Sequence, residues 1–296
     1  MDDTERLHYR AAAILRLETA VVTQQDVSTH YTHGNLIAAI RDGIAALGKT
    51  TDSITIDDLA PIDEFHVGGR QASEHFLDQL DLTPKKHVLD IGCGLGGPAR
   101  FAASRYRCRV DGIDLTPEYV ETGRQLCRWL GLDDRISLHQ GSALAMPFTD
   151  GAFDGAYMLH VGMNIADKAA LCAEVSRVLR PDSLFGIYDV MRIGDGDLTF
   201  PLPWATTGAS SAVVEPAHYR NALEAAGFAV VAEHNRRDFA LGFFEQSRAR
   251  TMAASGPPPL GLHVLMGRNA SDKIQNMTRN ISEGRIAPIE LIARKI

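Results

Sequence analysis

Apolar residues in the first part of the chain recur at the spacing of amphipathic helices. This spacing is visible at 14–21, clearer at 36–47 and present again at 76–80. A polar loop is expected at 61–70. No run in this part has the character of a buried strand, so we expect residues 1–86 to form a helical N-terminal cap.

The pattern changes at residue 87, where short apolar runs begin to alternate with helical segments. Strands are predicted at 87–92, 109–115, 136–140, 153–159, 183–190, 228–234 and 289–293. Helices are predicted between them at 97–105, 117–131, 167–179 and from about 216 to 227. Such alternation produces right-handed crossovers and a parallel sheet that is covered by helices on both faces.

The last two predicted strands are separated by a helical segment at 239–285 that contains several methionines. These two strands could pair with each other across that insertion. The predicted fold class is therefore α/β, a doubly wound sheet of seven strands. We expect four parts: the cap at 1–86, a core at 87–238, the insertion at 239–285 and a final core strand at 286–296.

The strongest candidate for chemistry is the segment Val88-Leu-Asp-Ile-Gly-Cys-Gly-Leu-Gly-Gly97, which ends the first predicted strand. Gly92, Gly94 and Gly97 satisfy the pattern G-x-G-x-x-G, in which glycines let the backbone turn sharply and approach a ligand closely. Asp114 ends the second strand, where a carboxylate can accept hydrogen bonds from both hydroxyls of a ribose. The two features together predict a ligand that contains adenosine.

Four features favour S-adenosylmethionine over NAD as that ligand. Asp90 stands just before the first glycine, where a carboxylate would repel an anionic pyrophosphate but tolerates a cationic sulfonium amino acid. The glycine motif follows a long helical segment, whereas dinucleotide-binding folds commonly begin with it. The other two features are the segment 141–148 after the third strand, and Phe153-Asp154 together with Val178-Leu-Arg-Pro181 around the fourth and fifth strands.

The combination VLDIGCGLGG…GIDLT…GSALAMPF…FDGAYMLH…VLRP resembles the class I S-adenosylmethionine-dependent methyltransferases. The chain is similar to their small-molecule branch, which includes the ubiquinone/menaquinone C-methyltransferases and the sarcosine/dimethylglycine N-methyltransferases. The resemblance is strong over residues 60–190 and loose at the termini. It implies a Rossmann-like methyltransferase sheet, S-adenosylmethionine as cofactor with S-adenosylhomocysteine as product, and an insertion that lines the substrate site. It does not identify the substrate.

The resemblance also implies roles for individual residues around the cofactor. Four residues would line its methionine part: Asp90, Gly92, Cys93 and Gly94. Asp114 would hold the ribose hydroxyls, and Leu115 would pack on the adenine. Ser142 and Ala143 would lie at the adenine edge, although Ser142 replaces an acid that family members often have, so the contact there could move to a backbone group.

Two histidines are the candidates for catalysis. His160 follows the fourth strand, at the carboxyl edge of the sheet where ligands of such folds bind, but a cofactor contact or a structural role is an equal alternative. His66, in Phe-His-Val-Gly-Gly, resembles a loop that closes over the site in related enzymes. Tyr31 resembles a tyrosine that covers the methionine end of the cofactor. Asn164 is expected to cap a helix rather than to contact the substrate.

Composition narrows the possible partners. The 296 residues include 30 Lys+Arg and 37 Asp+Glu, which give a formal net charge of −7, so we expect no nucleic-acid partner. The 4 cysteines are too few and too widely spaced for a disulfide scaffold or a zinc site, and no His/Asp/Glu cluster has the spacing of metal ligands, so no metal is expected.

The sequence also predicts where the protein acts. The charged N-terminus does not resemble a secretory signal, and no apolar run approaches the length of a membrane span. We therefore expect a cytoplasmic enzyme with reduced thiols that transfers a methyl group to a nitrogen, oxygen or carbon atom of a small molecule. A nicotinamide-dependent oxidoreductase and a non-catalytic cofactor-binding regulator stay open as alternatives, as does a homodimer.

Overall fold

A seven-stranded sheet forms the centre of the molecule in the computed structural model, which describes residues 23–254 and 258–296. The strand order is β3-β2-β1-β4-β5-β7-β6. The strands are β1 (His87–Ile91), β2 (Arg109–Asp114), β3 (Ile136–Gln140), β4 (Phe153–Leu159), β5 (Leu179–Arg192), β6 (Phe228–Asn235) and β7 (Ile286–Lys295). The first five are parallel, and β7 runs antiparallel to both β5 and β6. The predicted α/β class and the pairing of the last two strands are confirmed.

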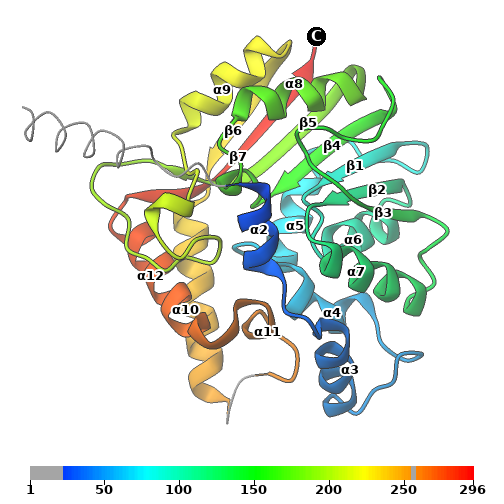
Figure 1. Ribbon diagram of the computed structural model, residues 1–296, viewed down its shortest axis with the longest axis vertical. Coiled ribbons are helices and arrows are strands. Elements are labelled where there is room, and N and C mark those ends of the chain that lie inside the picture. Colours follow the sequence, from blue (N-terminus) through cyan, green and yellow to red (C-terminus); the bar gives the residue numbers. More distant parts are fainter. Residues whose placement is uncertain (1–22, 255–257) are drawn as a thin grey trace, which may run out of the picture.

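Helices cover both faces of this sheet, as the alternation predicted (Figure 1). One face packs against α5 (Gly69–Leu77), α6 (Gly97–Arg105) and α7 (Pro117–Trp129). The other face packs against α8 (Lys168–Val178) and α9 (Pro216–Ala225). The buried core is thus two apolar layers with the sheet between them, and it fixes the edge where the strands end.

Three further helices, α2 (Gln24–Tyr31), α3 (Leu36–Ala46) and α4 (Ile56–Asp63), precede α5 in the N-terminal part. The expected helix at 14–21 lies outside the described residues. The loop expected at 61–70 was wrong at its start, because α4 continues through Pro61 to Asp63. This helix begins at a capping box, in which Thr55 accepts from the Asp58 amide and Asp58 accepts from the Thr55 amide.

The insertion between β6 and β7 contains α10 (Arg237–Ala253), α11 (His263–Met266) and α12 (Ala270–Ser282). Its inner side joins an apolar cluster with the loop after β5, through residues such as Trp204, Met277 and Ile281. Figure 1 shows α2, α3 and α4 on the same side of the sheet as α10, α11 and α12. Among the helices described, none combines the length and apolar character needed to cross a bilayer. The division into cap, core and insertion stays a prediction.

Candidate cofactor and acceptor site

A cavity of about 1880 Å³ opens where β1, β2 and β4 end, between the core, the N-terminal helices and the insertion. All the site residues predicted from the sequence line it: Tyr31, His66, Asp90, Gly92, Cys93, Gly94, Asp114, Leu115, Ser142, Ala143 and His160. Residues far apart in the chain, such as Tyr31 and His160, thus share one cavity. Their individual roles stay predictions.

The turn after β1 needs glycine at two positions for different reasons. Gly92 has a φ of +69°, and a Cβ there would lie 2.3 Å from Val161 Cγ2, so its constraint is packing. Gly94 has a φ of +53°, and a Cβ there would meet nothing closer than the Tyr119 ring at 3.9 Å. The Gly94 backbone therefore faces open cavity, as expected where a ligand approaches the chain closely.

Asp114 holds this turn from the end of β2. Its Oδ2 accepts a hydrogen bond from the Gly94 amide at 2.9 Å, and its Oδ1 accepts from the Thr116 amide at 2.8 Å. Burial raises the pKa of the carboxyl group. Each oxygen has a further lone pair for a ligand hydroxyl, so Asp114 both shapes the turn and can bind a ribose.

Asp90 is a buried carboxyl group with one unpartnered oxygen. The residue is 1% exposed, and its Oδ2 has no hydrogen bond among the described residues. Burial raises its pKa well above the usual range. An unpaired buried carboxylate is costly unless a cation joins it. The α-ammonium group of S-adenosylmethionine would supply that cation, so the residues present fit this cofactor.

The rings of His160 and His66 lie against each other in the wall of the cavity. Their rings stack with centroids 5.9 Å apart, and the His160 ring nitrogens have no partner in the described chain. His160 has a φ of +54°, and its amide donates to the Tyr188 carbonyl at 2.7 Å. Burial lowers the pKa of His160 well below its usual range and that of His66 to about 4. Both rings are therefore neutral at pH 7.

Tyr31 connects the N-terminal helices to the loop after β4. Its hydroxyl lies 3.3 Å from Asn164 Nδ2, which donates to it. The expectation that Asn164 caps a helix is wrong, because Asp167 is the N-cap of α8 and accepts from the Ala170 amide. The Asn164 amide instead joins this loop to α2.

Two polar residues that attach the cap were missed at the sequence level. Gln24 Nε2 donates to Ser142 Oγ at 2.8 Å, and Glu118 accepts from the backbone amides of His33, Gly34 and Leu36. Both contacts join residues more than 80 positions apart. No local pattern marks such pairs.

The insertion contributes both apolar and polar side chains to the cavity. Its apolar members, from α10, α11 and α12, include Leu241, Phe244, Met266 and Met277, and Met163 after β4 and Trp204 after β5 line the same cavity. Met266 and Met277 of the insertion are buried and line the cavity, whereas Met252 is 77% exposed and does not. In residues 23–254 and 258–296, no group of three His, Cys, Asp or Glu side chains could hold a metal ion. All four cysteines are free and buried.

The open sheet with one antiparallel strand, the glycine turn at β1 and the acid at the end of β2 define the class I methyltransferase fold. Residues 88–182 match the family model described as a methyltransferase domain. This match supports the resemblance found in the sequence, and residues 88–182 form a methyltransferase domain of the class I, S-adenosylmethionine-dependent type.

Known relatives resemble parts of the chain. The methyltransferase GfsG of Streptomyces halstedii is 29% identical over 174 residues, which are 58% of this chain and 60% of that protein. A sterol 24-C-methyltransferase of Eremothecium gossypii is 34% identical over 129 residues, which are 43% of this chain and 35% of that protein. The chain thus matches less than two thirds of the length of either relative.

A solved structure resembles nearly the whole chain. Geranyl diphosphate C-methyltransferase from Streptomyces coelicolor A3(2), solved with Mg²⁺, geranyl diphosphate and S-adenosylhomocysteine, superposes with a TM-score of 0.67. It is 20% identical and covers 92% of this chain and 97% of that one. At this coverage the likeness extends well beyond residues 88–182.

Proposed function

We propose that this protein is an enzyme that transfers the methyl group of S-adenosylmethionine to a small organic acceptor and releases S-adenosylhomocysteine. The observation that carries the proposal is Asp90, whose buried side chain has an unpartnered Oδ2, beside a backbone turn that is open at Gly94. This pair suits a ligand that is cationic at one end and packs closely against the chain. The methyl acceptor would be a nitrogen, oxygen or carbon atom.

The predicted roles of the cofactor residues agree with this arrangement. Asp114 is available for the ribose hydroxyls, and Leu115, which lines the cavity next to it, would pack on the adenine. Ser142 is already engaged by Gln24, so we propose that Ala143 and the backbone nearby read the adenine edge. Bound S-adenosylmethionine would supply an activated methyl group for displacement.

The size of the cavity supports two ligands. A typical ligand pocket holds about 300–1,000 Å³, whereas this cavity has about 1880 Å³. The side at β1 and β2, which carries Asp90 and Asp114, suits the cofactor. The side formed by the insertion, with apolar side chains such as Phe244 and Met266, suits the acceptor. The chain's contribution to the reaction would be to align the two and to exclude water.

A ligand-dependent melting experiment tests the proposal. S-adenosylhomocysteine at about 100 times its Kd should stabilise the protein by roughly 2.7 kcal/mol, whereas NADH should have no effect. Equal stabilisation by NADH would overturn the proposal in favour of an oxidoreductase. Binding of S-adenosylhomocysteine without methyl transfer to any acceptor of a broad panel would favour the regulator.

We also propose that the enzyme acts in the cytoplasm on a free small molecule and not on nucleic acid. The supporting observations are the four free thiols and the acidic net charge of −7. A homodimer remains an open alternative, which sedimentation at several protein concentrations would decide.

A further inference from the structure

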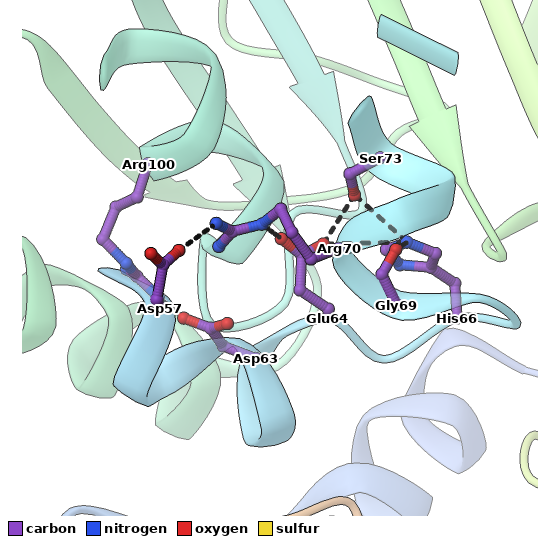
Figure 2. A network of polar contacts seen from close by, with 8 residues as sticks. All are labelled: Asp57, Asp63, Glu64, His66, Gly69, Arg70, Ser73 and Arg100. Carbon is purple, nitrogen blue, oxygen red and sulfur yellow. Dashed lines mark hydrogen bonds and ion pairs between the residues drawn. The ribbon is translucent and has the colours of Figure 1, made fainter. Parts of the chain in front are cut away.

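Glu64 lies at the centre of a buried polar network that no sequence pattern indicated. Its side chain has no exposed surface, and it lines the cavity. Oε1 accepts from Arg70 Nε at 2.7 Å, and Oε2 accepts from Ser73 Oγ at 2.6 Å (Figure 2). Oε2 also lies 3.6 Å from His66 Nε2. The network thus holds a negative charge beside a histidine that borders the cavity.

The directions of these hydrogen bonds determine which nitrogen of His66 carries the proton. The Ser73 hydroxyl gives its one hydrogen to Glu64, so toward His66 its oxygen can only accept. The Gly69 carbonyl oxygen can only accept as well. Both oxygens lie 3.1 Å from His66 Nε2. Nε2 therefore carries the hydrogen and Nδ1 keeps a free lone pair.

The remaining nitrogen, Nδ1, is free to act as a base. In the described part of the chain, the hydrogen bonds of the His66 ring all involve Nε2. Burial keeps the ring uncharged at neutral pH, since it lowers the pKa of His66 to about 4. The groups that face it are Glu64, Asp63, Arg70, Tyr188 and the neutral His160. Among them, the carboxylates of Glu64 and Asp63 would stabilise the positive charge that protonation of Nδ1 creates.

We propose that His66 Nδ1 is the general base for a hydroxyl-bearing acceptor, and that Glu64 and Ser73 are positioning residues that hold the ring for this task. The inference rests on the proposed methyltransferase function and specifies its acceptor class. The acceptor oxygen bonds the methyl carbon as the carbon–sulfur bond breaks, and that bond's electron pair stays on sulfur. The hydroxyl proton passes to Nδ1 and later to water. The products are a methyl ether and S-adenosylhomocysteine.

The acceptor class follows from what a base contributes. A neutral amine already presents a nucleophilic lone pair, and it can lose its proton after the methyl has transferred. A hydroxyl is a poor nucleophile until its proton begins to leave, so a positioned base accelerates its reaction by about 10²–10⁴-fold. A buried histidine with a fixed tautomer and a neighbouring carboxylate therefore accelerates methylation of a hydroxyl, whereas methylation of an amine gains little from it.

Nitrogen NMR of the ¹⁵N-histidine-labelled protein, loaded with S-adenosylhomocysteine, tests the positioning directly. His66→Gln assigns the signals, and the expected pattern is a protonated Nε2 with a bare Nδ1. The opposite tautomer would overturn the proposal. Calorimetry with S-adenosylhomocysteine precedes this measurement, so a protein that fails to bind it refutes the proposed function before any histidine is examined.

The kinetic test compares phenols with anilines of the same shape as acceptors. Glu64→Gln and His66→Gln should lower kcat for phenols by about 100-fold or more, with KM and anilines affected less than about tenfold. Glu64→Gln should also move the low-pH limb of kcat to lower pH, because the imidazolium loses its anionic neighbour. Equal losses for both acceptor classes, or methylation of anilines alone, would overturn the base role and leave the methyltransferase function standing.

Asp57→Asn is the matched control. Asp57 also contacts Arg70, at 3.0 Å, but its side chain is 89% exposed and it does not touch His66. The same loss of one negative charge there should leave the phenol-to-aniline ratio unchanged. Should Glu64→Gln fail to fold, Ser73→Ala removes only the bridging hydroxyl and should reduce the same ratio.

Discussion

The two walls of the cavity are built from different interactions. The cofactor wall, at the ends of β1 and β2, is shaped by left-handed glycines and by amides that donate to Asp114. The insertion wall is shaped by packing of side chains such as Leu241 and Met277. Hydrogen bonds fix the orientation of the groups that they join, whereas packing fixes the volume of the space between side chains. Changes in the first wall should therefore alter cofactor affinity, and changes in the second should alter stability and acceptor fit.

The largest effect is expected from Gly94→Val. A side chain at this position would project into the cavity, because no protein atom but the Tyr119 ring lies within 4 Å of a Cβ there. Binding of S-adenosylhomocysteine should weaken by about 1,000-fold or more, roughly 4 kcal/mol. Gly131→Val is the control, since Gly131 has a φ of +63° and open space outside the cavity. Gly131→Val should introduce the same backbone strain, and calorimetry should show an unchanged affinity for S-adenosylhomocysteine.

Asp114→Asn should weaken binding by about 100-fold, roughly 3 kcal/mol, because a charged acceptor of two ribose hydroxyls is lost. The melting temperature should also fall slightly, since Asp114 holds the Gly94 and Thr116 amides in the absence of ligand. Asp111→Asn, which removes a carboxylate earlier in the same strand that pairs with His87, should leave the affinity intact. Unaltered affinity in Asp114→Asn would place the ribose elsewhere.

Acidification should reveal the burial of His66, which lies between the two walls. Its pKa is about 4 in the folded protein against 6.5 without burial, so below pH 6.5 the unfolded chain binds more protons. This part of the stability is therefore present above pH 6.5 and is lost as the pH falls toward 4. Denaturant unfolding at pH 7 and pH 4 should show wild type losing about 3 kcal/mol more than His66→Gln. Equal losses would mean that the ring is solvated.

Met277→Ala tests the insertion wall. The residue is 2% exposed within the apolar cluster of the insertion, so the truncation should cost about 2–3 kcal/mol of unfolding free energy. Affinity for S-adenosylhomocysteine should stay within about twofold of wild type. A large loss of that affinity would show that the two walls are not independent.

Glu118→Gln should have the smallest effect. It weakens the acceptor of three backbone amides that follow α2, at a cost of about 1 kcal/mol. Hydrogen exchange should speed up at residues 31–36 while the glycine turn keeps its rate. A second measurement compares hydrogen exchange of wild type with and without S-adenosylhomocysteine. If the bound ligand protects only the glycine turn, the N-terminal cap does not cover the site and Tyr31 is not a cofactor-binding residue.

The sequence was sufficient for the cofactor wall and much less so for the rest. Strand alternation and the glycine motif lie within short windows, so the sheet and the placement of Gly94 and Asp114 could be predicted. Glu64 could not, because its partner Ser73 lies on the next helix and its burial depends on the packing of α4 and α5. The contact between Gln24 and Ser142 likewise depends on how the chain folds back on itself.

The way the insertion is attached has a consequence for the history of such proteins. It leaves the sheet after Asn235 and returns at Ile286, and these two ends sit on paired neighbouring strands, with Asn235 opposite Ile289. An exchange or lengthening of the segment between them changes neither the strand order nor the glycine turn. After gene duplication, changes in this insertion could therefore alter which acceptor is methylated, while selection keeps the methyl donor unchanged.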